Sequence, residues 1–284
     1  MIWRAQLAIC LLLSALTGGD PRYHYSSWSD DPEPYREAIR KTEAAPPLNL
    51  AAGERICAGI VTHHFLASGM MVRFFAGLQA QTSPQTIILI GPNHFHHGLA
   101  NVSVSSLPWK TPFGIVETNT QIVERIKAAA NLPEDSDAFA GEHSVGVLMP
   151  FVRYYFPHAR IVPILIDVNA KENALRALRG LMSGYLADSN ILVLLSMDFS
   201  HNSLASISDA RDAQAQQALS TLDLDKTEGL NVDCRKGLWL LLASLRNSGP
   251  VRVRITGHTN SARLTGNPQQ PDVTSYFSVL FLRR

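Results

Sequence analysis

Residues 86–97, TIILIGPNHFHH, combine a strand-forming run, a Gly-Pro stop and three histidines within four positions. The run 86–90 is apolar and β-branched without polar alternation, which favours a strand covered on both faces of a sheet. Glycine and proline then end the strand. In open α/β sheets, ligands bind where the carboxyl ends of the strands meet. We therefore predict that the histidines after this strand stand at the edge where a site would be built.

Two other apolar runs end in the same way. ICAGIV, residues 56–61, and ILVLLS, residues 191–196, are each followed by polar side chains with acid–base or metal-binding chemistry. These side chains are His63 and His64 after the first run, and Asp198 and His201 after the second. Three strands that each lead into histidine favour one shared cluster over three unrelated loop residues.

The rest of the chain alternates short strand-like runs with amphipathic segments. Strands are predicted at 56–61, 86–90, 101–105, 160–166, 191–196, 251–256 and 276–282, and helices at 68–80, 118–129, 143–155, 172–187, 207–220 and 234–247. This alternation predicts an α/β fold: a single three-layer domain over residues 55–284, with a mostly parallel or mixed sheet and helices on both faces.

The N-terminal part has a different composition. Residues 1–20 have one basic residue, an apolar stretch and then small residues, which predicts a signal peptide or a short membrane anchor. Residues 21–54 are rich in Asp, Pro, Ser, Tyr and Glu and are interpreted as a tether or surface wrap with a short charged helix at most. We expect the protein to be exported, periplasmic or extracellular, or to be anchored to a membrane by its N-terminus.

The charge balance bears on partners. With 25 Lys and Arg against 24 Asp and Glu, the chain has no basic surplus for a nucleic acid, so no nucleic-acid partner is expected. Membrane contact is expected only through the N-terminal segment. The remaining partner class is a small-molecule substrate of unknown identity.

A late first-row metal is the cofactor that clustered imidazoles favour. Within the run HFHH, His94 is the preferred ligand because it follows the turn directly, while His96 and His97 are assigned to the surface or to a supporting role. Two imidazoles leave iron, copper and zinc open, so a third ligand has to decide. The candidates are Cys234, Glu142 and Asp198.

The local sequence gives each candidate a different setting. Cys234 is predicted in a first helical turn that Asn231 or Asp233 caps, where the helix dipole and two basic neighbours would lower the pKa of the thiol. Glu142 and His143 stand at the start of another predicted helix, where capping would be their minimal role. Asp198 and His201 are three positions apart, a spacing at which Asp198 could orient the imidazole.

Taken together, these stretches resemble the MEMO1-like family, also called AmmeMemoRadiSam system protein B. The resemblance covers about residues 56–282 and is carried by VTHHFLASGMMVRFF, IILIGPNHF, GEHSVGVLMPFVRYYFP, IVPILI, LLSMDFSH and DCRKGLWLLLASL. It implies a fold similar to the class III extradiol ring-cleaving dioxygenases. Metal ligands are then implied at His63, His94 and Cys234, with His64 as the alternative to His63. His201 is implied as the proton-handling residue, with Asp198, Glu142 and His143 lining the pocket.

Three functions follow from this site. The first is a non-haem metal protein, Fe(II) before copper or zinc, with redox or dioxygenase-like activity on a small molecule. The second is a non-catalytic metal- or partner-binding module that keeps a vestigial pocket. The third is a zinc-dependent hydrolase that uses His63, His94, Asp198 and a bound water.

Overall fold

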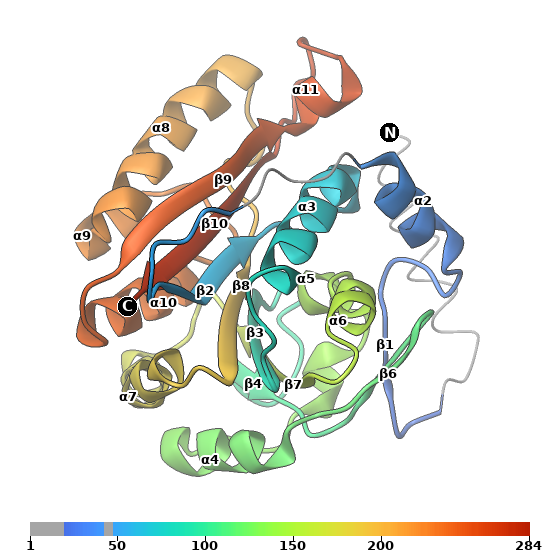
Figure 1. The fold of residues 1–284 in the computed structure, drawn as a ribbon, viewed down its shortest axis with the longest axis vertical. Coiled ribbons are helices and arrows are strands. Elements are labelled where there is room, and N and C mark those ends of the chain that lie inside the picture. The colour runs from blue at the N-terminus through green and yellow to red at the C-terminus, as the bar shows by residue number, and fades with distance from the viewer. Residues whose placement is uncertain (1–19, 43–47) are drawn as a thin grey trace.

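The main sheet of the computed structural model has seven strands in the order β4-β7-β3-β8-β2-β10-β9 (Figure 1). The structure describes residues 20–42 and 48–284. The four neighbours β7, β3, β8 and β2 run parallel, whereas β4, β10 and β9 join antiparallel. The strands are β2 (Arg55–Val61), β3 (Thr86–Pro92), β4 (Val102–Val104), β7 (Arg160–Ile166), β8 (Ile191–Ser196), β9 (Arg252–Asn260) and β10 (Ser275–Arg283). The carboxyl ends of four strands thus share one edge.

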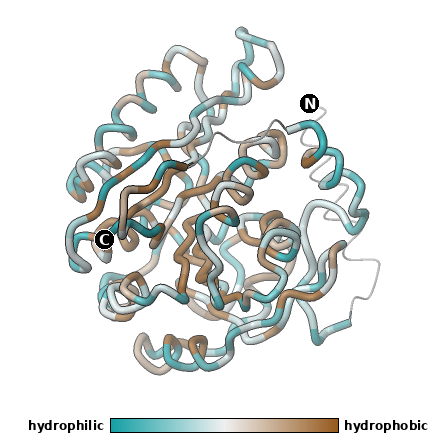
Figure 2. Tube along the Cα trace, in the orientation of Figure 1, coloured by the Kyte–Doolittle hydropathy of each residue, from teal (hydrophilic) through white to brown (hydrophobic). Residues whose placement is uncertain are grey.

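Strand β3 explains why the parallel runs are apolar throughout. Ile88 and Ile90 pack in one core cluster, and Ile87 and Leu89 pack in the other, on the opposite face of the sheet. Side chains of a strand alternate between faces, so a strand covered on both sides needs apolar residues at every position. The strongest hydropathy in Figure 2 lies along these central strands.

Helices cover both faces of the sheet (Figure 1). The larger core cluster joins the sheet to α4 (Thr120–Ala130), α7 (Glu172–Ala187), α8 (Ala205–Thr221) and α10 (Arg235–Asn247). The other cluster joins it to α3 (Ser68–Gln79) and α6 (Met149–Tyr155). Shorter helical elements are α9 (Leu224–Thr227), α11 (Ser261–Thr265) and the 3₁₀ turns Phe65–Ala67 and Ser136–Phe139. The predicted three-layer α/β fold with a mixed sheet is confirmed.

A second, small sheet escaped the sequence prediction. It consists of β1 (His24–Tyr25), β5 (Trp109–Thr111) and β6 (Gly114–Val116), in the order β1-β5-β6. Strands of two or three residues are too short for an alternating pattern to emerge.

The segment interpreted as a tether or wrap contains β1 and helix α2 (Glu33–Lys41). Tyr35 of this helix is fully buried, and the ring of Trp28 stacks on Phe65 at a centroid distance of 4.7 Å. Residues 21–42 therefore pack against the body of the domain.

The predicted helix over 143–155 is broken into α5 (His143–Gly146) and α6. Pro150 lies in the first turn of α6, where a missing N–H costs nothing because those N–H groups have no intrahelical partner. The break falls before the proline and leaves α5 as a separate short helix.

The predicted signal peptide, residues 1–20, lies outside the described residues except for Asp20. In residues 20–42 and 48–284, every helix is too short or too polar to cross a membrane.

Candidate metal centre

Three histidines converge at the carboxyl edge of the parallel strands. His63 follows β2, His94 follows β3, and His143 begins α5. Each offers a ring nitrogen, and these nitrogens lie within 4.8 Å of one another. A second group, which shares His63 and adds Asp198 and Asp233, meets the same distance. The topology thus brings together side chains from five separate parts of the chain.

His63 is held with its Nε2 atom toward this cluster. Its Nδ1 lies 2.9 Å from the Ser196 hydroxyl, which in turn donates its hydrogen to the carbonyl of Ser144. Because the hydroxyl has only one hydrogen, its oxygen must accept from Nδ1. The hydrogen of a neutral His63 therefore sits on Nδ1, and Nε2 presents a lone pair to the pocket.

His94 has the same orientation through a carboxylate. Its Nδ1 donates to Glu142 Oε1 at 2.9 Å, and its backbone N–H donates to Glu142 Oε2 at 2.8 Å. Glu142 also caps α5 by accepting from the Ser144 N–H. A carboxylate behind the distal nitrogen is the usual support for a metal-ligating histidine, since it fixes the tautomer and the ring.

His143 completes the cluster by stacking on His94, with ring centroids 4.2 Å apart and planes 20° apart. Its Nδ1 lies 3.5 Å from Glu142 Oε1. The close packing of helix α5 on strand β3 brings the two rings together, because Ser144 donates to the carbonyl of Pro92 at the strand end.

Asp233 lies where the imidazoles meet. Its Oδ2 is 3.2 Å from Nε2 of His63, 3.7 Å from Nε2 of His94 and 4.0 Å from Nε2 of His201. Both of its oxygens also accept from the Asp198 N–H at 3.1 Å. One carboxylate oxygen therefore faces three ring nitrogens, an arrangement that needs protons or a cation between them.

Asp198, His201 and His64 occupy different surroundings. Asp198 accepts from the Thr62 hydroxyl and lies 3.9 Å from His63 Nε2. His201 is fixed through its backbone N–H, which donates to Asn231 Oδ1 at 2.5 Å. His64 bonds through Nδ1 to the Tyr276 hydroxyl and lies outside both three-residue groups of the described residues. The structure thus brings His63, not His64, to the cluster.

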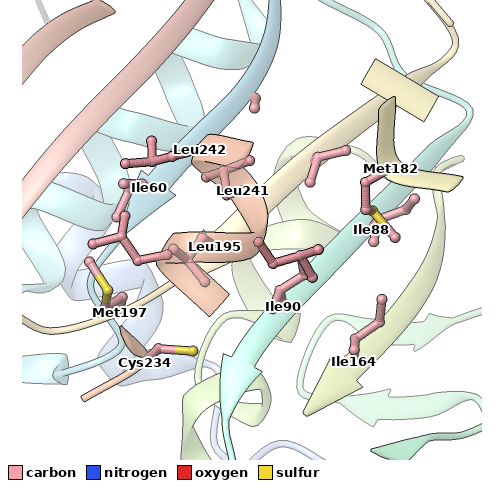
Figure 3. Close-up of a cluster of buried hydrophobic side chains, with 14 of the residues drawn as sticks. Ile60, Ile88, Ile90, Ile164, Met182, Leu195, Met197, Cys234, Leu241 and Leu242 are labelled. Atoms are coloured by element: carbon pink, nitrogen blue, oxygen red, sulfur yellow. The ribbon is translucent and has the colours of Figure 1, made fainter. Parts of the chain in front are cut away.

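Cys234 is buried, and its side chain packs among apolar residues that include Met197 and Leu195 (Figure 3). It belongs to neither of the two groups formed by the described residues. The predicted lowering of its thiol pKa is wrong: burial and the negative charge of Asp233 raise that pKa well above its usual range. The helix dipole and the basic neighbours fail to lower the pKa of the thiol because the sulfur is removed from water.

The charges of the cluster follow from the pairing of imidazoles with carboxylates. Burial opposes a charged His94, but the hydrogen bonds to Asp233 and Glu142 outweigh it and raise the pKa to about 10. Burial also opposes a charged His63, whose pKa Asp198 and Asp233 nevertheless raise. Conversely, burial and the charges on His94 and His63 lower the pKa of His143 to about 3.

The carboxylates respond in the opposite sense. Burial alone would raise the pKa of Glu142, yet its hydrogen bond with His94 lowers it to about 2. The pKa of Asp233 is also lowered against the effect of burial, chiefly by the charge and hydrogen bond of His63. Both side chains are therefore anionic at neutral pH.

Asp233 is the residue that sequence reasoning missed as part of the pocket. It was predicted as a helix cap, as was Asn231, and both cap assignments are wrong. The helix begins after Cys234 with no side-chain cap, and the two side chains bind the N–H groups of Asp198 and His201 instead. The only available signal was an acidic residue next to the candidate cysteine.

Comparisons with known proteins agree with this architecture. A model of the family described as Memo-like protein matches residues 25–279. A MEMO1 family protein of Pyrobaculum aerophilum is 27% identical over 243 residues, which is 81% of this chain and 85% of the relative. One from Methanopyrus kandleri is 24% identical over 270 residues, covering 89% and 95%.

A solved structure is also similar. The uncharacterized protein JW3007 from Escherichia coli K12 superposes with a TM-score of 0.51 at 12% identity, over 78% of this chain and 98% of that one, which supports the fold. The family match extends over the strands that precede His63 and His94 and over the loop that contains Asp233. The resemblance inferred from the sequence is confirmed, and the chain belongs to the Memo-like family.

Proposed function

We propose that the pocket binds a late first-row divalent metal through His63 and His94, with iron as the physiological ion, and that it supports redox or dioxygenase-like chemistry on a small molecule. The observation that carries the proposal is the shared orientation of the two rings. Each Nδ1 is engaged behind the pocket, by Ser196 or Glu142, and each Nε2 points into it.

The residues fit a metal in charge as well as in direction. The two Nε2 atoms face the carboxylate of Asp233, so a cation would take the place of the protons that otherwise have to separate these groups. Two imidazoles and a carboxylate are the ligand set of non-haem Fe(II) oxygenases. Bound Fe(II) would supply coordination positions for a small substrate and O₂, together with one-electron chemistry.

The chain's own residues would then position the substrate and move protons. The side chains of His94, His143 and His201 are 25%, 31% and 30% exposed, so the pocket is accessible from this side. His201, held at its backbone by Asn231, is suited to exchange a proton between solvent and a bound substrate. The Ser196 hydroxyl and the buried Glu142 carboxylate keep the metal-facing rings in place.

The test is the iron content of the full-length chain purified anaerobically without an affinity tag. His94→Ala is expected to abolish bound iron while the circular dichroism spectrum stays unchanged. His258→Ala is the matched control, because His258 also binds a buried aspartate, with Nε2 2.7 Å from Asp212, but lies apart from the cluster on β9. Stoichiometric iron in His94→Ala would refute the assignment.

Turnover separates the enzyme from a non-catalytic binding module. Iron-loaded protein that consumes no O₂ with catechol-like or thiol substrates would favour the binding module. Zinc on purification, together with cleavage of esters or amides, would instead favour the hydrolase, which the carboxylates beside His63 could also serve.

A further inference from the structure

We infer that Asp233, and not the adjacent Cys234, supplies the anionic ligand of this pocket, and that the site therefore favours Fe(II) over Cu(I). The inference rests on the proposed metal binding by His63 and His94 and names the third ligand and the metal preference of that site. It departs from the His/His/Cys set implied by the family resemblance.

The Asp233 carboxylate lies next to both metal-facing histidines. Asp233 Oδ2 is the atom that both metal-facing nitrogens approach, at 3.2 Å for His63 and 3.7 Å for His94. Asp233 would therefore be the third ligand of an ion held by His63 and His94. The side chain of Asp233 is only 10% exposed, so the carboxylate is committed to this cluster.

The Asp233 carboxylate is held in place by hydrogen bonds with the backbone of Asp198. The Asp198 N–H donates to both oxygens of Asp233, and the Asp233 N–H donates back to the carbonyl of Asp198 at 3.3 Å. The carboxylate therefore has a fixed orientation. Metal-ligating carboxylates are commonly held by such outer hydrogen bonds.

The sulfur of Cys234 lies in the hydrophobic core beside Gly237. A Cβ built on Gly237 would lie 2.5 Å from Cys234 Sγ and 2.9 Å from Leu195 Cδ1, so the missing side chain at 237 is what gives the sulfur its space. Cys234 belongs to the buried hydrophobic cluster that also contains Met197 and Leu195 (Figure 3). The thiol fills the core where α10 meets the sheet.

The ligand change has a chemical consequence. Soft thiolate ligands select Cu(I), whereas imidazole combined with carboxylate suits Fe(II) and zinc. A pocket with the carboxylate of Asp233 in place of a thiolate therefore discriminates against Cu(I).

The test compares the full chain with Asp233→Asn and Cys234→Ser by anaerobic titration with Fe(II) and Cu(I). Asn keeps the shape of Asp and one oxygen for the Asp198 N–H, so the variant is expected to fold. Asp233→Asn should weaken Fe(II) binding by at least about tenfold, since even supporting groups contribute that much. Cys234→Ser and the matched control Asp212→Asn should retain wild-type Fe(II) affinity.

A spectrum of the unmodified chain gives an independent readout. Wild-type protein loaded with Co(II) should lack the intense near-ultraviolet band of sulfur-to-cobalt charge transfer. That band, a loss of Fe(II) in Cys234→Ser, or unchanged Fe(II) affinity in Asp233→Asn would each overturn the inference while leaving the proposed function intact. A preference of the wild type for Cu(I) would overturn the inference together with the assignment of iron. Failure of the wild type to bind any of these metals would instead refute the proposed function.

Discussion

Two histidines in different parts of the molecule are both largely buried but have opposite charge preferences. His94, in the pocket, has its pKa raised to about 10, because its hydrogen bonds to Asp233 and Glu142 outweigh burial. His24, on β1 of the small sheet, has its pKa lowered to about 4 by burial, which the distant charge of Glu134 only partly offsets. Its ring nitrogen bonds to the Ser105 hydroxyl at 2.8 Å.

The hydrogen-bond partner, and not the depth of burial, sets the charge of these two imidazoles. Aromatic rings surround His24, with Trp109 at 4.9 Å and Phe139 at 5.3 Å between centroids. A hydroxyl satisfies the hydrogen bond of a neutral ring but provides no counter-charge for an imidazolium. The pocket provides carboxylates, and so it can hold positive charge, whether as protons or as a metal.

The largest expected effect is the pH dependence of stability due to His24. Its pKa is about 4 in the folded chain against about 6.5 in the unfolded chain, so between these values the unfolded state binds more protons. The contribution is complete above the unfolded pKa and is lost as pH falls from about 6.5 to 4. The shift corresponds to about 3 kcal/mol. Urea unfolding across this pH range measures it.

A matched pair of variants isolates this contribution. His24→Gln keeps a polar group near Ser105 and should make the stability profile less steep between pH 4 and 6.5. His143, whose pKa is also lowered, to about 3, should keep part of the slope. His158→Gln, which replaces an exposed histidine, should leave the slope as in the wild type. An unchanged slope in His24→Gln would contradict the comparison.

A smaller effect is expected when the counter-charge behind His94 is neutralised. Glu142→Gln removes the carboxylate that accepts from His94 Nδ1 and from two backbone N–H groups. Loss of such a supporting group typically lowers metal affinity by about 10–100-fold, which competition with a chelator can measure. Glu134→Gln is the control, because Glu134 acts on His24 and lies outside the cluster, and this variant should retain wild-type metal affinity.

The smallest effect is expected for a charge pair in water. Lys41 Nζ lies 2.5 Å from Glu37 Oε1, but the two side chains are 75% and 51% exposed. Solvent screens such pairs, so Lys41→Met should leave the urea midpoint unchanged within error. A clear loss of stability in Lys41→Met would show that an exposed ion pair can stabilise this fold.

Much of the fold could be predicted from the sequence because its signals are local. The parallel strands are apolar between their end residues, and β3 and β8 match their predicted cores. The edge at which His63 and His94 meet follows from strand direction alone. Short elements such as β1 were missed, since two residues contain no periodic pattern.

The side-chain choice between Asp233 and Cys234 could not be predicted. These neighbours precede α10, and Cys234 has φ −115° and ψ 52°, outside regular helix geometry. The direction of each side chain depends on this irregular backbone and on the space beside Gly237, neither of which a linear pattern encodes. The residue types alone therefore favoured Cys234, and not Asp233, as the third metal ligand.

Gly91, next to the last residue of β3, limits how this centre could be rebuilt in another protein. A Cβ there would lie 2.7 Å from Ser144 Oγ and 3.1 Å from Val145 Cγ1. Any side chain would therefore displace the Ser144 hydroxyl, which donates to the Pro92 carbonyl, and would crowd α5 next to His143. A transplanted site would have to carry this bare stretch of backbone along with its histidines, because the absent methyl group sets how closely two parts of the chain can meet.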